Sequence, residues 1–220
     1  MFRGVCFDLD GTLLDSLKDL ANAMNQTLSG LGLPQHPLST YKQFVGDGVD
    51  FLARRALPPD HQDQAFLEQV IERYRAHYQK KMSENTRPYE GILELLDVLQ
   101  KARIKLAVLS NKPDDPTQHL VKLLFGKIRF DHIQGARADI PKKPDPAAAL
   151  ETARMMKIFP AECVYIGDTG TDMKTAVHSG MFPVGVLWGF RGAQELLEAG
   201  AKILISKPRE LMQVVFFSQN

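Results

Sequence analysis

Two aspartates, one residue apart, follow the first apolar segment of the chain. Val5-Cys6-Phe7 leads directly into Asp8-Leu9-Asp10, and Gly11-Thr12 comes next. Carboxylates at the end of a buried strand repel each other unless a positive group lies between them. Mg²⁺ binds in proteins through one or two carboxylates, several waters and a substrate phosphate. The segment therefore predicts a metal site with a nucleophile beside it.

Two other interpretations of this acidic segment were considered. Aspartate before glycine is common in turns, so simple capping of a turn remains an alternative. A calcium loop fits less well, because Thr12 stands where the third acid is needed and no glutamate follows at the twelfth position. A hard cation with few protein ligands, such as Mg²⁺, fits better.

Polar groups also follow later apolar segments. Ser110 and Asn111 come after one such segment, Asp168 comes after another, and Asp172 lies in the first turn of the predicted helix that follows. Lys143 lies between a second lysine and a pair of prolines that stiffen its backbone. Ligands of open parallel sheets bind outside the carboxyl ends of the strands. We therefore expect these side chains to converge on Asp8 and supply a metal ligand (Asp168) and groups for an anion.

Each of these residues also has a simpler interpretation. Ser110 and Asn111 are compatible with an ordinary cap between a strand and a helix, and Asp172 with a helix N-cap. Most lysines are solvated surface charges, which is how we interpret Lys142. The rigid setting of Lys143 favours a role in the site.

The apolar segments indicate an α/β fold. Their side chains are mostly Val, Ile, Leu and Phe without clean alternation, which is typical of strands buried on both faces. The predicted strands are Gly4–Asp8, Ile104–Ser110, Ile133–Ala136, Cys163–Gly167, Pro183–Trp188 and Lys202–Ile205. Helical patterns lie between them, and Asp145-Pro146 is expected to open one helix as its N-cap and first residue. This order predicts a doubly wound, mostly parallel, Rossmann-like sheet.

Residues 16–85 interrupt the alternation of strands and helices. No strand is predicted there, and the apolar residues fall into three stripes with helical spacing. The stripes are Leu17, Leu20, Ala21, Met24, Leu28 and Leu31; Val49, Leu52, Ala53, Ala56 and Leu57; and Phe66, Val70, Tyr74 and Tyr78. We therefore expect a core domain of residues 1–15 and 86–220 and an inserted α-helical cap domain of residues 16–85.

Composition limits the class of protein. The 220 residues include 27 basic and 26 acidic side chains, so nothing indicates binding to nucleic acid or a membrane surface. Both cysteines, Cys6 and Cys163, lie in apolar runs and are expected to be buried free thiols. The histidines lack zinc-site spacing, and no signal peptide or membrane-spanning run is visible. A cytoplasmic protein is expected.

Four segments together resemble the motifs of the haloacid dehalogenase superfamily. They are Asp8–Ser16, Ser110-Asn111, Lys143–Pro146 and Gly167–Asp172, in the order of that family. The resemblance spans residues 3 to about 191, and the helical stretch after Ser16 resembles the cap of one large branch. Softer signals resemble bacterial phosphoglycolate phosphatases: Phe44–Gly48, Arg54–Leu57, Ser110–Pro113 and Val186–Arg191.

The resemblance implies roles for the acidic residues. Asp8 would be the nucleophile that forms an aspartyl-phosphate, and Asp10 would protonate the leaving group and then activate water. Mg²⁺ would bind Asp8, the backbone carbonyl of Asp10, and Asp168. Asp172 would orient a metal-bound water or Lys143 from outside the metal shell.

The resemblance also assigns substrate-binding groups. Ser110, Asn111 and Lys143 would hold the phosphoryl oxygens. Gly46, Asp47 and Gly48 form a candidate substrate loop in the cap, with a plain turn between helices as the alternative. Arg54 and Arg55 were considered as partners of a substrate carboxylate, although an exposed helix charge is the simpler interpretation for at least one of them.

The expected function is a Mg²⁺-dependent phosphatase that hydrolyses a small phosphate monoester, with phosphoglycolate as the first candidate. Pyrophosphatase, nucleotide phosphatase, sugar-phosphate phosphatase and phosphomutase activities of the same superfamily remain alternatives. A signalling receiver domain is the rival outside the class, and a non-catalytic binding module is a further one. The expected partner is a small phosphorylated metabolite, and the protein is expected to be a monomer or a homodimer.

Overall fold

A six-stranded parallel sheet forms the centre of the computed structural model, which describes residues 2–217. The strands lie side by side in the order β5 (His132–Ala136), β4 (Lys105–Pro113), β1 (Gly4–Phe7), β6 (Cys163–Gly167), β7 (Phe182–Val186) and β8 (Ile203–Ile205). All six correspond to predicted strands. The chain adds strands first on one side of β1 and then on the other, which is the doubly wound arrangement expected from the sequence.

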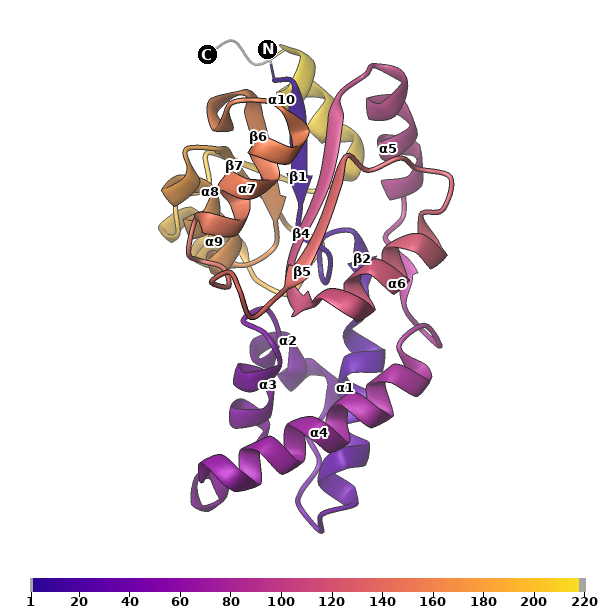
Figure 1. Cartoon of the computed structure of the whole chain (residues 1–220), viewed down its shortest axis with the longest axis vertical. Coiled ribbons are helices and arrows are strands. Elements are labelled where there is room, and N and C mark those ends of the chain that lie inside the picture. Colours follow the sequence, from indigo (N-terminus) through magenta and orange to yellow (C-terminus); the bar gives the residue numbers. More distant parts are fainter. Residues whose placement is uncertain (1, 218–220) are drawn as a thin grey trace.

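Helices cover both faces of this sheet (Figure 1). Their bounds are α5 (Ile92–Lys101), α6 (Asp114–Leu124), α7 (Ala147–Met156), α8 (Gly170–Ser179), α9 (Ala193–Glu198) and α10 (Leu211–Phe217), with single turns at Pro160–Glu162 and Pro208–Glu210. Cys6 packs in one apolar cluster with α7 and α8, whereas Val5 and Phe7 pack in another with α5 and α10. Successive strand residues point to opposite faces, so covering both faces requires continuous apolar segments.

Four helices follow the first strand and form the helical insert, which we define as Leu17–Lys81. They are α1 (Leu17–Ser29), α2 (Leu38–Phe44), α3 (Val49–Ala56) and α4 (Gln64–Lys81). Figure 1 shows the insert as a group beyond the end of the sheet where β4 finishes. The three predicted stripes lie on α1, α3 and α4. Helix α2 was not predicted, because Tyr41 is its only buried residue and gives no periodic pattern.

The chain enters and leaves the insert at neighbouring points. A two-residue antiparallel pair joins β2 (Leu14–Asp15) to β3 (Arg87–Pro88). The buried carboxylate of Asp19, in the first turn of α1, accepts hydrogen bonds from the backbone N–H groups of Asn85 and Thr86 at 2.9 and 2.8 Å. Burial raises the pKa of Asp19, but hydrogen bonds from the side chains and then the backbone N–H groups of Asn85 and Thr86 outweigh burial and lower that pKa. The Asp19 side chain therefore connects the first helix of the insert to the segment by which the chain leaves the insert.

The N-terminus of α7 differs from the prediction. Pro146 occupies the N-cap instead of the first helical position, and the Asp145 carboxylate accepts a hydrogen bond from Ala147 N–H at 2.9 Å. The aspartate still caps the helix, from one position further back. Within residues 2–217, no helix is both long enough and apolar enough to span a membrane.

Candidate active site

Three buried carboxylates meet at the carboxyl ends of β1 and β6. One oxygen from each of Asp8, Asp168 and Asp172 lies within 4.8 Å of the others. The three residues are between 0% and 5% exposed, so water does not screen their mutual repulsion. Several carboxylate oxygens at this separation fit a hard divalent cation. The donor set therefore fits a divalent cation, and it includes Asp172, which was expected from the sequence to lie outside the metal shell.

Lys143 is the positive charge within this cluster. Its Nζ donates to Asp8 Oδ1 at 2.8 Å, to Asp172 Oδ1 at 2.6 Å and to the Leu109 carbonyl at 3.2 Å. Burial lowers the pKa of Lys143, but the charges of Asp172 and Asp8 outweigh burial and raise it. The cluster holds three carboxylates and one ammonium, so its net charge is negative when all three carboxyls are ionised. A bound cation would offset that charge.

Asn111 fixes the backbone that presents Lys143. The Asn111 side-chain carbonyl accepts from Lys143 N–H at 2.9 Å, and its amide donates to the Lys143 carbonyl at 3.1 Å. The same amide lies 3.3 Å from the Gly46 carbonyl of the insert. Asn111 therefore joins three segments, a role that strand-end capping did not suggest.

The buried setting disfavours the charged forms of two carboxyls. Burial, followed by the charge of Asp172, raises the pKa of Asp8 to about 7, although Lys143 opposes the shift. Burial and the charges of Asp172 and Asp8 raise the pKa of Asp168 well above its usual range. A bound cation would relieve this cost, because opposite charge favours the ionised form.

Backbone from two loops encloses Asp168. Thr12 Oγ1 donates to one carboxylate oxygen at 3.1 Å, and Phe190 N–H donates to the other at 2.8 Å. A Cβ at Gly189 would lie 2.3 Å from Asp168 Cβ, and one at Gly11 would lie 2.3 Å from Asp168 Oδ2. Both positions therefore require glycine because of this close approach, and no role was predicted for Gly189 from the sequence.

Asp172 acts in two ways. Its Oδ2 accepts from Thr169 Oγ1 at 2.6 Å and from Thr169 N–H at 3.1 Å, which caps α8. Its Oδ1 binds Lys143. One oxygen of Asp172 therefore caps the helix and the other binds the lysine of the site, so both predicted interpretations of this residue agree with the geometry.

Asp10 is paired with a different lysine. Lys112 Nζ lies 2.6 Å from Asp10 Oδ2, and Ser16 Oγ donates to Asp10 Oδ1 at 2.6 Å. Lys112 is buried, and its ammonium lies 4.7 Å from the ring centroid of Tyr78 on α4. Ser110 Oγ accepts from Lys112 N–H at 3.2 Å. Lys112 lies in the Ser110–Pro113 segment noted in the sequence, but no role was predicted for its side chain.

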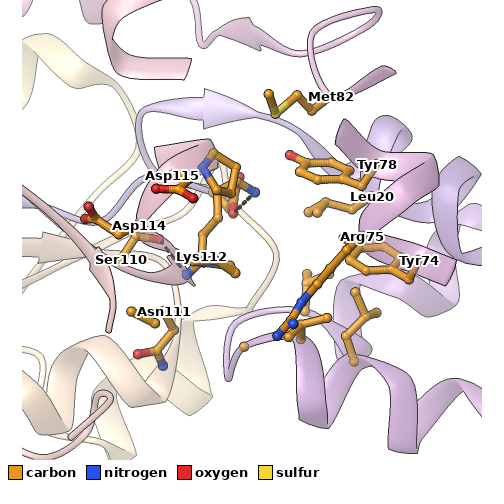
Figure 2. Close-up of a pocket in the computed structure, with 18 of the residues that line it drawn as sticks. Leu20, Tyr74, Arg75, Tyr78, Met82, Ser110, Asn111, Lys112, Asp114 and Asp115 are labelled. Carbon is orange, nitrogen blue, oxygen red and sulfur yellow. Dashed lines mark hydrogen bonds and ion pairs between the residues drawn. The ribbon is translucent and has the colours of Figure 1, made fainter. Parts of the chain in front are cut away.

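A cavity of about 700 Å³ separates the insert from the sheet and contains this edge of the site (Figure 2). From the core it is lined by Asp8, Asp10, Ser110, Asn111, Lys112, Asp114 and Asp115, and from the insert by Gly46, Gly48, Tyr74, Arg75, Tyr78 and Gln79, among others. This volume lies within the range of small-molecule sites. The Tyr78 hydroxyl is buried without a hydrogen-bond partner among the described residues.

The candidate substrate loop lies at this cavity. Gly46 and Gly48 line it with φ of +117° and +94°, a backbone region that favours glycine. Asp47 does not line it; its carboxylate accepts from Thr171 Oγ1 at 2.6 Å and pairs with Arg55 at 2.6 Å. Arg54 donates to the Gln64 side chain, so both arginines considered for a substrate carboxylate are engaged elsewhere.

Comparison with known proteins gives the family. The pattern of the haloacid dehalogenase-like hydrolases matches residues 5–186. A phosphoglycolate phosphatase of Aquifex aeolicus is 32% identical over 213 residues, covering 97% of this chain and 96% of that protein. One of Pseudomonas savastanoi pv. phaseolicola is 34% identical, covering 94% and 78%. The crystal structure of a protein from Lactobacillus delbrueckii subsp. bulgaricus superposes on this chain with a TM-score of 0.91. The two sequences are 30% identical, and the match covers 99% of both chains. The chain belongs to the haloacid dehalogenase-like hydrolase family and is an enzyme.

Proposed function

We propose that this enzyme is a Mg²⁺-dependent phosphatase of a small phosphate monoester, with phosphoglycolate as the first candidate. The observation that supports this most strongly is the contact of Asp8 with Lys143, beside Asp168 and Asp172, at the edge of the cavity. A carboxylate that approaches a phosphate dianion needs positive charge at the point of attack. The names of the relatives in Aquifex and Pseudomonas favour phosphoglycolate over other esters.

In the proposed first step, an oxygen of Asp8 attacks phosphorus while the ester oxygen leaves. Asp10 donates a proton to that oxygen, so the alcohol departs neutral and Asp8 holds the phosphoryl group. Ser16 and Lys112 orient Asp10 for this transfer. Lys143, Ser110 and Asn111 stabilise the phosphoryl oxygens, with Asn111 also fixing the Lys143 backbone.

In the second step, water attacks phosphorus and the bond to the Asp8 oxygen breaks. Asp10 takes the proton of that water, which restores its protonated form and frees inorganic phosphate. Asp8 and Asp168, with the backbone carbonyl of Asp10, would hold Mg²⁺. The ion would supply positive charge to the phosphoryl oxygens when bound. Asp172 holds Lys143 in place from the opposite side.

Residues 16–85 are proposed to act as a cap on a core of residues 1–15 and 86–220. Asp8, Asp10, Ser110, Asn111 and Lys143 are proposed to contact the phosphoryl end, so the insert side of the cavity is available to recognise the rest of a substrate. The loop Gly46-Asp47-Gly48 is proposed to close the cavity over it and exclude bulk water. The buried free thiols of Cys6 and Cys163 support a reducing compartment, which agrees with a cytoplasmic location.

A panel of phosphate esters tests this proposal. Inorganic phosphate release is measured for phosphoglycolate, pyrophosphate, a nucleoside monophosphate and a sugar phosphate, with and without a magnesium chelator. The proposal predicts release that the chelator abolishes and that is fastest with phosphoglycolate. Release unaffected by chelation, or interconversion of sugar phosphates without release of phosphate, would contradict it.

A further inference from the structure

The permanently charged basic side chains that line the cavity differ in what they already bind. Lys112 is paired with Asp10, and Arg137 is paired with Asp139 and Glu151 at 3.1 Å each. Arg75 on α4 also lines the cavity, and its guanidinium makes no hydrogen bond or ion pair with any residue in 2–217. Its guanidinium is therefore available to a ligand.

Asp50, the acid whose pKa is affected by the charge of Arg75, is already paired with Lys142. Lys142 Nζ lies 2.5 Å from Asp50 Oδ2. Burial raises the pKa of Asp50, whereas its bond to Lys142 and, further down, the charge of Arg75 lower it. The charge of Arg75 thus affects Asp50 at the start of α3, although the two side chains form no ion pair. Figure 2 shows the side chain extending from α4 into the space that faces Asn111 and Lys112.

The charges of the two walls favour one orientation for a substrate with two anionic ends. The core wall carries Asp114 and Asp115, and its cations Lys112 and Arg137 are already paired with acids, so it attracts a second anion less than the insert wall does. The insert wall carries Arg75, and Gln79 lies one helical turn further along the same face. A guanidinium presents paired N–H groups that match both oxygens of a carboxylate.

We propose that Arg75 binds a carboxylate at the end of the substrate opposite the phosphoryl group. The cavity thereby selects short phosphate monoesters that carry a carboxylate over uncharged esters of the same length. This inference rests on the proposed phosphatase function and deepens it. Arg75 replaces Arg54 and Arg55 as the candidate, because it reaches the cavity and they are bonded within the insert.

Turnover with two esters of matched length tests this assignment. Phosphoglycolate is compared with 2-hydroxyethyl phosphate, in which an uncharged hydroxymethyl group replaces the carboxylate. Arg75→Gln is expected to lower kcat/KM for phosphoglycolate roughly 10- to 100-fold, mainly through KM, because a hydrogen bond to a charged group is lost. The value for 2-hydroxyethyl phosphate should change less than about twofold. Arg75→Lys should restore part of the loss.

Arg73→Gln is the matched control, since Arg73 is exposed on the same helix and does not line the cavity. It should leave both substrates unchanged. An equal loss for both esters in Arg75→Gln, or no loss for either, overturns the assignment.

Binding separates this inference from the proposed function. In an Asp8→Asn background, calorimetry with phosphoglycolate and with inorganic phosphate measures affinity without turnover. Weaker phosphoglycolate binding in Arg75→Gln, with phosphate binding unchanged, supports the carboxylate subsite even for an enzyme that releases no phosphate. Unchanged phosphoglycolate binding overturns the subsite while leaving phosphatase activity intact.

Discussion

At the scale of single residues, the site concentrates negative charge that the fold alone does not balance. Asp8 and Asp172 share one buried ammonium, that of Lys143, and the carboxylate of Asp168 lies beside them. Burying unpaired charge destabilises a protein, so this arrangement is explained by what it binds. A cation and a phosphoryl group supply the complementary charges.

Asp8→Asn should separate activity from stability. The substitution keeps the shape of the side chain and removes the nucleophile, so turnover should fall on the order of 10⁴-fold. It also removes one buried negative charge, so the melting temperature measured with a chelator should equal or exceed that of the wild type. Asp97→Asn, at a surface acid paired with Lys101, is the control that should change neither quantity. Substantial activity in Asp8→Asn would rule out its role as nucleophile.

Magnesium should stabilise the folded chain through Asp168. A ligand present at 100 times its dissociation constant adds about 2.7 kcal/mol to the free energy of unfolding. In a chain of this size that corresponds to a rise in melting temperature of roughly 5 to 10 °C. Thermal unfolding with increasing Mg²⁺ should show this rise in the wild type and in Asp97→Asn, and should lose most of it in Asp168→Asn. An undiminished rise in Asp168→Asn would place the metal elsewhere.

At the scale of elements, the parallel strands explain why both the sheet and the residues gathered at its edge could be predicted from the sequence. Runs such as Val5–Phe7 and Cys163–Ile166 specify strands buried on both faces, and the residues that follow each strand then necessarily share one edge. Helix α2 and the β2–β3 pair were missed, because seven and two residues give no usable period. The contact of Lys112 with the Tyr78 ring and the position of Arg75 at the cavity depend on how the insert sits on the sheet. No local pattern contains that information.

Asp19 should control how firmly the insert is attached. Its carboxylate accepts from Asn85 and Thr86, and Asp19→Ala leaves their N–H groups without this partner, which should lower the free energy of unfolding by about 2 to 4 kcal/mol. Urea unfolding measures the change. Glu84→Gln, at an exposed acid in the same linker, is the control and should have little effect.

The contribution of Asp19 should also depend on pH. Its folded pKa is lowered, so the stability it adds is fully present above the unfolded pKa of about 4 and is lost as the pH falls through the folded value. The difference in unfolding free energy between wild type and Asp19→Asn should therefore be largest near neutral pH and shrink in acid. A difference that grows in acid would contradict this account.

At the scale of the whole molecule, one loop of the insert is fastened to the core beside the cavity. Thr171 donates to Asp47, Arg191 donates to the Val45 carbonyl at 2.9 Å, and Lys142 pairs with Asp50. These contacts come from core segments next to the carboxylate cluster. They hold the insert against the site in the arrangement seen here (Figure 1).

Weakening these contacts should favour a more open molecule. Thr171→Val removes a partly buried hydrogen bond to a charged group, of about 1.5 to 3 kcal/mol, whereas Lys142→Ala removes an exposed ion pair of about 0 to 1 kcal/mol. Small-angle scattering should show a larger radius of gyration in Thr171→Val than in Lys142→Ala. Lys122→Ala, at an exposed lysine on α6, should match the wild type. Equal radii of gyration in all variants would show that other contacts hold the insert against the core.

Formation of an aspartyl-phosphate on Asp8 defines the proposed mechanism, and trapping this intermediate tests it. The enzyme is mixed with phosphoglycolate carrying radioactive phosphorus and Mg²⁺, quenched in acid within the first turnover, and digested. Mass spectrometry then locates the label. We predict one phosphoryl group on the peptide that contains Asp8, and none in Asp8→Asn. Rapid release of phosphate with no label on Asp8 would contradict the mechanism proposed for this site.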